Sequence, residues 1–372
     1  MGTTYHRRQF LHHAVFAVPS MIAMDAMAAQ LYKDKGAGVN QDKKLGIALL
    51  GLGKYSEEQL APALAETQHC KLTGIITGSP EKIKKWQQKY DIPEKNIYNY
   101  ENFDSIKDNP DIDIVYVVVP NALHAQYTIM AANAGKHVIC EKPMATSVAD
   151  CQAMIAACKK AGKMLSIGYR LHFEPHHMAF MDFGKKKKFG KLNKITAVDS
   201  QEMEKGAWRL DRERSGGGPL MDLGIYCVQA AIYSAGTNPI SVTAKEGEKT
   251  DLDRFQEVEQ SIEFQLEFPN NVVANCQTSY ADSGNLLRVD AEKGFYELQP
   301  AYAYDGIKGK TSQGDMGLKN VNQQALQMDD FARCILNKTQ TRVPGDMGLR
   351  DVKILMAIYE AAKTGKKVNL DL

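Results

Sequence analysis

A carboxylate and a phenol stand one helical turn apart in the most informative segment of the chain. Asp222 and Tyr226 are separated by four positions, and they follow the run Gly216–Pro219. Because proline suits the first turn of a helix, the segment predicts a helix with both side chains on one face. Such a pair can bind a hydroxyl group and accept its proton. A helix-capping Asp222 beside an amphipathic Tyr226 is the purely structural alternative.

A second group of polar residues directly follows predicted strands. Ligands of open α/β sheets bind at the carboxyl ends of the strands, so these residues should border a cofactor cleft. They are Pro120, Asn121, His124, Glu141 and Lys142. Lys142 suits hydrogen bonding to a substrate hydroxyl next to the acid–base pair. A surface cation is the alternative for Lys142, and a histidine at a helix start is the alternative for His124.

A glycine turn in the first part of the chain indicates dinucleotide binding. Gly51 and Gly53 end a predicted strand and open a predicted helix, with Lys54 and Tyr55 completing the turn. Glycines at such a turn let backbone N–H groups approach a pyrophosphate. Ser56 stands where the dinucleotide-binding fingerprint has its third glycine. The strand–turn–helix context still favours dinucleotide binding over a plain turn.

The end of the second predicted strand indicates which dinucleotide binds. NAD enzymes usually place a carboxylate there, which accepts hydrogen bonds from the ribose hydroxyls. This strand ends at Thr77, and Lys82 follows in the next helix. A hydroxyl and a cation suit a 2′-phosphate, so the sequence predicts NADP in preference to NAD. A capped helix start with a surface lysine is the alternative.

The order of the predicted elements indicates two domains. Strands and helices alternate as far as residue 169, which predicts a doubly wound parallel sheet of the Rossmann type. The expected strands are 45–51, 71–77, 112–119, 137–140 and 164–169, and the expected helices are 57–66, 80–90, 122–134 and 147–161. Strands then follow without intervening helices, which predicts an α+β domain with a large, mainly antiparallel open sheet. These strands are 195–201, 240–245, 258–268, 272–280 and 286–290, and helices 322–336 and 349–364 close the chain.

The amino terminus has the layout of an export signal. Arg7 and Arg8 precede the moderately apolar stretch 14–24, and Ala26-Met27-Ala28 offers a cleavage site. This arrangement predicts a twin-arginine signal peptide over residues 1–28 and a periplasmic protein. An ordinary amphipathic start is the alternative. We therefore expect an N-terminal arm at 29–44, an NADP-binding domain at 45–168 and a substrate and oligomerisation domain at 169–372.

The composition excludes several classes of protein. With 372 residues and 44% hydrophobic content, the chain can form two packed domains. A formal net charge of +2 gives no reason to expect a nucleic-acid partner, and the apolar stretch near the amino terminus is too short for membrane insertion. The 7 cysteines are scattered, so we expect no disulfide framework. A cluster around Pro175, in a predicted loop, is not expected to bind a metal; it consists of His172, Glu174, His176 and His177.

Several segments together resemble the Gfo/Idh/MocA family of sugar oxidoreductases. The resemblance covers nearly the whole chain. It rests on residues 51–55, 97–100, 141–147, 168–170, 208–209, 216–226 and 357–362. It implies tightly held NADP and an exported enzyme that oxidises one sugar at C1 and reduces another. It also implies a homodimer or homotetramer formed through the sheet of the second domain.

The same resemblance implies roles for individual residues. It places catalysis at Lys142, Asp222 and Tyr226, the 2′-phosphate at Thr77 and Lys82, and further cofactor or cleft contacts at Tyr100, Arg170, Trp208 and Arg209. An NAD-dependent glycoside hydrolase on the same scaffold is the alternative enzyme. A non-catalytic sugar sensor is a further alternative, although a sensor has no need of an acid–base pair. Segments 202–208 and 302–304 depart from the pattern and leave the identity of the sugars open.

Overall fold

The computed structural model describes residues 44–372. The predicted signal peptide and all of the predicted arm except Lys44 lie outside the described residues. Within this part of the chain, none of the helices has the length and apolar character needed to cross a membrane.

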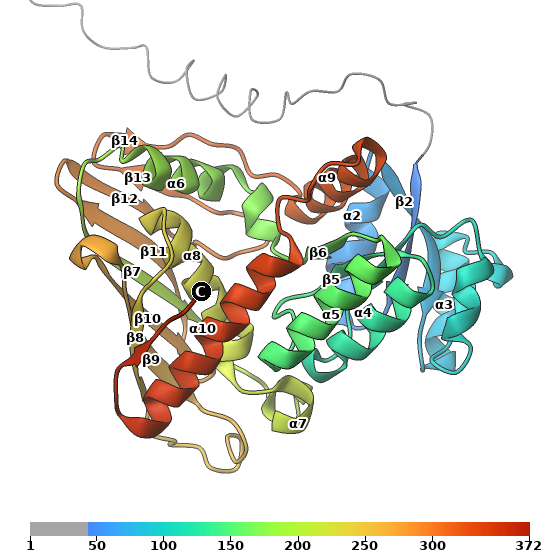
Figure 1. Cartoon of the computed structure of the whole chain (residues 1–372), viewed down its shortest axis with the longest axis horizontal. Helices are drawn as coiled ribbons and strands as arrows, with labels where there is room; N and C mark the ends of the chain where they lie inside the picture. Colours follow the sequence, from blue (N-terminus) through green and yellow to red (C-terminus); the bar gives the residue numbers. More distant parts are fainter. Residues whose placement is uncertain (1–43) are drawn as a thin grey trace, which may run out of the picture. The chain divides into compact units, whose positions relative to one another are not determined.

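The described chain contains two sheets with helices packed against them (Figure 1). The strands are β1 (Leu45–Leu50), β2 (Cys70–Ile76), β3 (Ile97–Tyr98), β4 (Ile114–Val117), β5 (His137–Cys140), β6 (Leu165–Ile167), β7 (Leu192–Ser200), β8 (Ser241–Glu246), β9 (Ser261–Glu267), β10 (Val273–Ser279), β11 (Gly284–Ala291), β12 (Gly294–Leu298), β13 (Gly309–Thr311), β14 (Gly314–Asp315) and β15 (Val368–Asn369). The α-helices are α2 (Ala61–Glu66), α3 (Pro80–Tyr90), α4 (His124–Asn133), α5 (Val148–Ala161), α6 (Pro175–Lys186), α7 (Arg212–Ser215), α8 (Ile225–Ala235), α9 (Gln323–Asn337) and α10 (Gly345–Thr364).

The first sheet is parallel and has the order β3-β2-β1-β4-β5-β6. The strand order reverses between β1 and β4, so the crevice at their carboxyl ends is where such a sheet binds its ligand. Strand β4 is buried along its whole length, as its β-branched sequence predicts for a central strand. The predicted doubly wound parallel sheet is confirmed.

The second sheet has nine strands in the order β14-β13-β12-β11-β7-β10-β9-β8-β15. Only β7 and β10 pair in parallel, so the prediction of a mainly antiparallel sheet is confirmed. Helices α6, α8 and α10 lie on one side of this sheet, and among the described residues no helix covers its other face (Figure 1).

The last two helices join the sheets. Helix α9 packs into the core of the first sheet, where Met328 and Phe331 are buried with Ile47 and Leu49. Helix α10 contacts α5 beside the first sheet and β8 of the second. Through Gln323, helix α9 also donates to the Ala303 and Tyr304 carbonyls in the loop after β12, so both helices connect the first sheet to the second.

The structure corrects the expected loop around the histidine cluster. Helix α6 begins at Pro175, which occupies its first turn, and the Glu174 side chain caps it by accepting a hydrogen bond from the His177 backbone N–H. His176 and His177 are thus helical and buried. The same rules that identify helix starts predict a helix here, because proline and a capping side chain are both start signals. Within residues 44–372, no three His, Cys, Asp or Glu side chains are arranged to hold a metal ion.

Candidate active site

The glycine turn after β1 leaves room beside its backbone. Gly51 has φ +100°, and a Cβ on it would lie 2.4 Å from the Val118 carbonyl oxygen. A Cβ on Gly53 would meet no atom within 4 Å, so open space borders the backbone there. Ser56, in place of the third glycine, is buried and donates through Oγ to the Gly51 carbonyl at 2.6 Å. The turn therefore fits a dinucleotide pyrophosphate, with the serine stabilising the turn itself.

The end of β2 adjoins this turn. Lys82 Nζ donates to the Leu52 carbonyl oxygen at 3.0 Å, and Thr77 Oγ1 accepts from the Ser79 N–H at 3.1 Å. The Tyr100 ring lies so close to Gly78 that a Cβ there would be 2.6 Å from it. The geometry thus places a cation and a hydroxyl beside the glycine turn, without a carboxylate at the end of the strand.

The residues after β4 and β5 lie at the predicted cleft but make mostly internal contacts. His124 is buried on α4, and its two ring nitrogens lie 2.8 Å from the Pro143 carbonyl oxygen and 2.9 Å from that of Val119. Burial lowers the pKa of His124. Asn121, which follows Pro120, donates from Nδ2 to the Ser215 carbonyl at 2.8 Å. Both side chains hold strand-end segments in place.

The Glu141 side chain also makes its hydrogen bonds within the protein. Its carboxylate accepts from the Tyr116 hydroxyl at 2.7 Å and from the Lys142 N–H at 3.2 Å. Burial raises the pKa of Glu141. A Cβ on Gly168 would lie 2.6 Å from its carboxylate, so only glycine fits beside it. Glu141 therefore orients the backbone at Lys142.

Lys142 and Asp222 form the charged centre of the site. Lys142 Nζ lies 3.0 Å from Asp222 Oδ1 and donates to the Asp222 carbonyl at 2.6 Å. The other carboxylate oxygen lies 2.8 Å from Arg209 Nε and accepts from the Tyr280 hydroxyl at 3.1 Å. Burial disfavours both charges, but Arg209 and Lys142 together lower the pKa of Asp222. Asp222 in turn raises the pKa of Lys142 against the effect of burial.

Tyr226 lies next to this centre at the start of α8. Its hydroxyl accepts from Arg170 Nε at 3.2 Å, and Lys142 Nζ lies 4.5 Å from the centre of its ring. The structure therefore brings the three predicted catalytic residues together. It also shows that Arg170 holds the phenol oxygen, whereas Lys142 holds Asp222 and contacts the ring face.

Arg170 is fixed from several sides. Its guanidinium donates to the Ala303 carbonyl at 3.0 Å, to the Tyr302 carbonyl at 2.6 Å and to Gln323. It also lies 4.4 Å from the Tyr304 ring centre. The Tyr304 ring centre lies 5.7 Å from that of Tyr55 in the glycine turn, with the rings tilted, so Arg170 connects the loop after β12 to the glycine turn.

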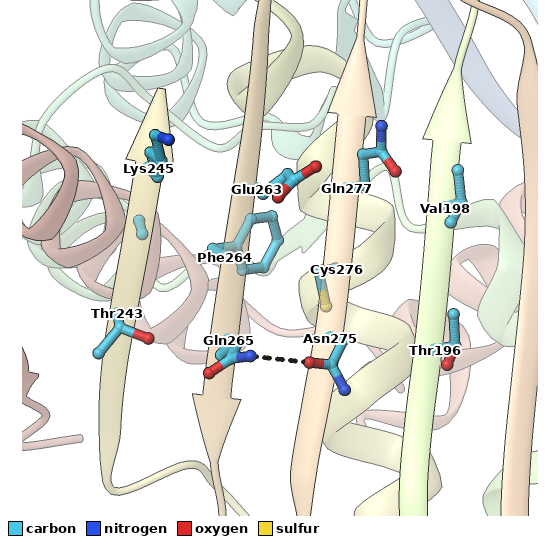
Figure 2. A pocket seen from close by; sticks show the side chains of 11 residues that line it. Thr196, Val198, Thr243, Lys245, Glu263, Phe264, Gln265, Asn275, Cys276 and Gln277 are labelled. Atoms are coloured by element: carbon cyan, nitrogen blue, oxygen red, sulfur yellow. Dashed lines mark hydrogen bonds between the residues drawn. The ribbon is translucent and has the colours of Figure 1, made fainter. Parts of the chain in front are cut away.

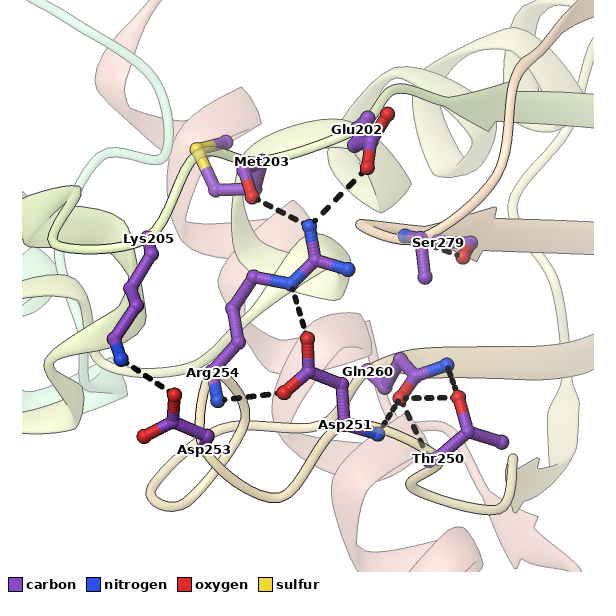
Figure 3. Close-up of polar contacts among 10 residues, drawn as sticks. Glu202, Met203, Lys205, Thr250, Asp251, Asp253, Arg254, Gln260 and Ser279 are labelled. Carbon is purple, nitrogen blue, oxygen red and sulfur yellow. Dashed lines mark hydrogen bonds and ion pairs between the residues drawn. The ribbon is translucent and has the colours of Figure 1, made fainter.

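The segment that carries Trp208 and Arg209 to the site is fixed by contacts with a neighbouring loop. Arg209 lies over the Trp208 ring, 4.7 Å from its centre. Figure 3 shows Arg254, which donates to the Met203 carbonyl at 3.0 Å and pairs with Asp251 at 3.2 Å. The segment therefore presents Arg209 to Asp222 from a fixed base.

Several residues of this arrangement could not be expected from the sequence. Tyr280 contacts Asp222 and Gln323 contacts Arg170, each from a distant part of the chain. Asp199 lies buried near the same charges. Tyr280 and Gln323 belong to no local motif. Asp199 lies in a strand with an alternating pattern, and the pattern does not distinguish it from the other strand residues.

Comparison with known proteins agrees with this geometry. Residues 45–169 match the model of an oxidoreductase family with an NAD-binding Rossmann fold, and residues 182–297 match a Gfo/Idh/MocA C-terminal domain. The chain belongs to the Gfo/Idh/MocA family of oxidoreductases, as its motifs predicted.

Individual relatives match over most of their length. The chain is 44% identical to the aldose–aldose oxidoreductase from Caulobacter crescentus, with a TM-score of 0.86, covering 88% of this chain and 100% of that one. It is 29% identical to D-xylose 1-dehydrogenase (NADP(+)) of Haloarcula marismortui, covering 89% of this chain and 94% of that protein. It is 25% identical to D-glucoside 3-dehydrogenase of Escherichia coli, covering 88% and 97% respectively.

Proposed function

We propose that this protein transfers a hydride between C1 of an aldose in its pyranose form and tightly bound NADP, with a second sugar as the hydride acceptor. The observation that carries the proposal is the Tyr226 hydroxyl, which lies on Arg170 and beside the Lys142–Asp222 pair. Arg170 connects this acid–base centre to the glycine turn of β1 through the Tyr304 and Tyr55 rings. The activities for which the aldose–aldose oxidoreductase and xylose dehydrogenase relatives are named support the same chemistry.

The residues of the site divide the work of the reaction. NADP, when bound, supplies the acceptor for the hydride that leaves C1. Tyr226 takes the proton of the C1 hydroxyl, so the aldose loses a hydride and a proton and leaves as a lactone. Arg170 and Lys142 stabilise the phenolate by their positive charge, and Asp222 binds a sugar hydroxyl. When the carbonyl of the second sugar is reduced, Tyr226 returns its proton to the carbonyl oxygen.

A cofactor that stays bound explains how such an enzyme works outside the cytoplasm, where free NADP is scarce. Two sugars then occupy one cleft in turn, so the kinetics are ping-pong. Purified protein mixed with an aldose, without added NADP, should develop reduced-cofactor absorbance stoichiometrically, and a second sugar should remove it. Protein that purifies without cofactor and needs a continuous supply of NADP would contradict tight binding.

Lys82 provides a test of the preference for NADP. Lys82→Ala removes a charge-assisted contact to the 2′-phosphate, which is worth about 1.5–3 kcal/mol. We expect the Kd for NADP to rise about 10- to 100-fold while the Kd for NAD changes little. Lys85→Ala is the matched control, because Lys85 lies on the same helix and pairs with the exposed Glu57. Equal losses of NADP and NAD affinity in Lys82→Ala would refute the assignment.

Export is proposed from the amino-terminal sequence, which lies outside the described residues. Arg7 and Arg8, the apolar stretch and Ala26-Met27-Ala28 support a twin-arginine signal and a periplasmic enzyme. Mass spectrometry of the protein from its native cell envelope should find a mature amino terminus near Ala29. Peptides from residues 1–20 on that protein would overturn the proposal.

The open face of the second sheet is the proposed surface of self-association. Figure 2 shows a groove on this face, with Val198 on the central strand and Gln265 donating to Asn275 at 2.9 Å. A homodimer or homotetramer would cover it, and light scattering should report at least twice the mass of one chain. Val198→Arg places a charge in the groove and should yield monomers. A monomeric wild-type protein would refute this interface.

A further inference from the structure

One buried carboxylate of the described chain has no partner. The other buried acidic side chains all accept hydrogen bonds from protein groups; they are Glu141, Glu174, Glu259, Glu297, Asp329 and Asp351. Asp199 is 6% exposed, yet no described residue donates a hydrogen bond to its carboxylate or pairs with it. Burying a carboxylate without a partner disfavours folding, so we expect Asp199 to have a role other than stabilising the fold.

The position of Asp199 indicates that reason. It is the next-to-last residue of β7, and its neighbours Thr196 and Val198 line the groove on the open face of the sheet. Since side chains alternate along a strand, Asp199 lies on the opposite face, towards α8. Helix α8 packs against β7 and carries Tyr226 near its start. The Asp199 carboxylate therefore lies on the face of β7 that packs against α8, the helix that carries Tyr226.

The charges of the site also act on this carboxylate. Burial raises the pKa of Asp199 to about 7, with Lys142 and Arg170 lowering it and Asp222 raising it. Asp199 is thus within electrostatic reach of the groups that surround the reacting hydroxyl. Each of those groups is already hydrogen-bonded within the protein, as described above, whereas both carboxylate oxygens of Asp199 are unused.

We propose that Asp199 binds a hydroxyl group of the sugar other than the one that reacts, and so helps to determine which aldoses fit. The inference rests on the proposed function, because a sugar is a ligand that brings several hydroxyl donors into one cleft. A bound hydroxyl would satisfy a carboxylate that the fold leaves unpaired. An aldose lacking that hydroxyl, or carrying it on the other face of the ring, would leave it unpaired and bind more weakly.

The contact between Asp199 and a sugar hydroxyl is tested by a double-change cycle, in which the protein and the sugar are altered separately and then together. Binding of D-glucose and its 2-, 3-, 4- and 6-deoxy analogues is measured by calorimetry on the enzyme holding reduced cofactor, so that no turnover occurs. We expect Asp199→Ala to weaken binding of glucose about 10- to 100-fold. We expect one deoxy analogue to bind the wild type as weakly as the variant binds glucose, with no further loss when the two changes are combined.

Two further measurements separate this contact from a structural role. Because the unpaired carboxylate disfavours folding, Asp199→Asn should unfold at the same temperature as the wild type or a higher one. Its KM for the aldose should rise while kcat stays within a few-fold. Asp182→Asn, which changes a carboxylate paired with Lys186 on α6, is the matched control and should alter neither value.

Each outcome decides the proposal. Equal losses for every analogue in the wild type and Asp199→Ala would show that no sugar hydroxyl lies on Asp199. A marked fall in unfolding temperature with unchanged sugar affinity would assign Asp199 to the fold. Failure of the proposed function is distinguishable, because it appears as absent turnover in the wild type while the binding cycle still reports on Asp199.

Discussion

Replacement of Tyr226 by phenylalanine is expected to lower kcat at least about 100-fold while the cofactor stays bound. Proton transfer by a placed side chain contributes about 10²–10⁴ in rate, and the Tyr226 hydroxyl is the group that we propose takes the proton. Its loss leaves the ring, and with it the Lys142 contact on the ring face, unchanged. The measurement is single-turnover reduction of the bound cofactor after mixing with an aldose.

A tyrosine outside the site provides the control for this prediction. Tyr90→Phe removes the same atom from a ring that packs on Trp86 at 5.1 Å, and it should turn over like the wild type. Near-normal turnover of Tyr226→Phe would exclude Tyr226 as the proton acceptor. His124 would not replace it without rearrangement, because both of its ring nitrogens lie on backbone carbonyls.

Loss of Lys142 should produce the second large effect. Lys142→Met leaves the Asp222 carboxylate buried with only Arg209 and Tyr280 as partners. Breaking a buried ion pair in this way costs up to about 3–5 kcal/mol of unfolding free energy, and the remaining partners reduce that cost. We also expect kcat/KM to fall at least about 100-fold, because both the hydroxyl-binding carboxylate and the charge beside the phenolate are disturbed. Thermal unfolding and steady-state kinetics measure the two effects.

A double variant separates the structural effect from the catalytic one. Lys142→Met combined with Asp222→Leu replaces both charges by apolar groups, which is often neutral for stability. Arg209 loses its partner in this variant, but its side chain is 36% exposed and can turn towards solvent. The double variant should therefore recover most of the lost unfolding free energy but none of the activity. Recovery of activity together with stability would assign the pair to the fold alone.

The pH dependence of stability gives a further check on the same pair. The pKa of Asp222 is lowered in the folded protein, so the pair stabilises the fold above the ordinary aspartate pKa of about 3.9. As the pH falls below that value, the unfolded chain takes up a proton first and the stabilisation declines. The difference in unfolding free energy between the wild type and Lys142→Met should accordingly be largest near neutral pH and narrow below about pH 4.

Much of the fold could be predicted because its signals are local. The strand predicted at 112–119 is apolar except for Asp113, and β4 occupies its middle, at 114–117; Val118 and Val119 continue the apolar sequence beyond the end of the strand. Helix α6 was missed because the histidines around Pro175 suggested a loop. The short strands β13 and β14 were missed because each has too few residues to show an alternating pattern.

The candidate site could be predicted as a set of residues but not as a set of contacts. Lys142, Asp222 and Tyr226 each stand at an element boundary with a chemical reason to be there, and the structure brings them together. The partner of the phenol oxygen depends on a contact between residues 170 and 226, which only the packed fold establishes. Asp199 was missed for a related reason, since its missing partner is a property of the surroundings and not of the strand sequence.

Transfer of deuterium from C1 of the sugar is the most direct test of hydride transfer to the bound NADP. The purified protein is mixed with [1-²H]glucose or [1-²H]xylose without added NADP. The cofactor is released by denaturation in mild alkali, in which the reduced nicotinamide survives, and is analysed by mass spectrometry together with the sugar product. We expect one deuterium on each reduced cofactor and an equal amount of the aldonolactone or its acid. Cofactor reduced without deuterium would place the oxidised carbon elsewhere on the sugar, and release of free sugar from an aryl glycoside without net oxidation would identify a glycoside hydrolase instead.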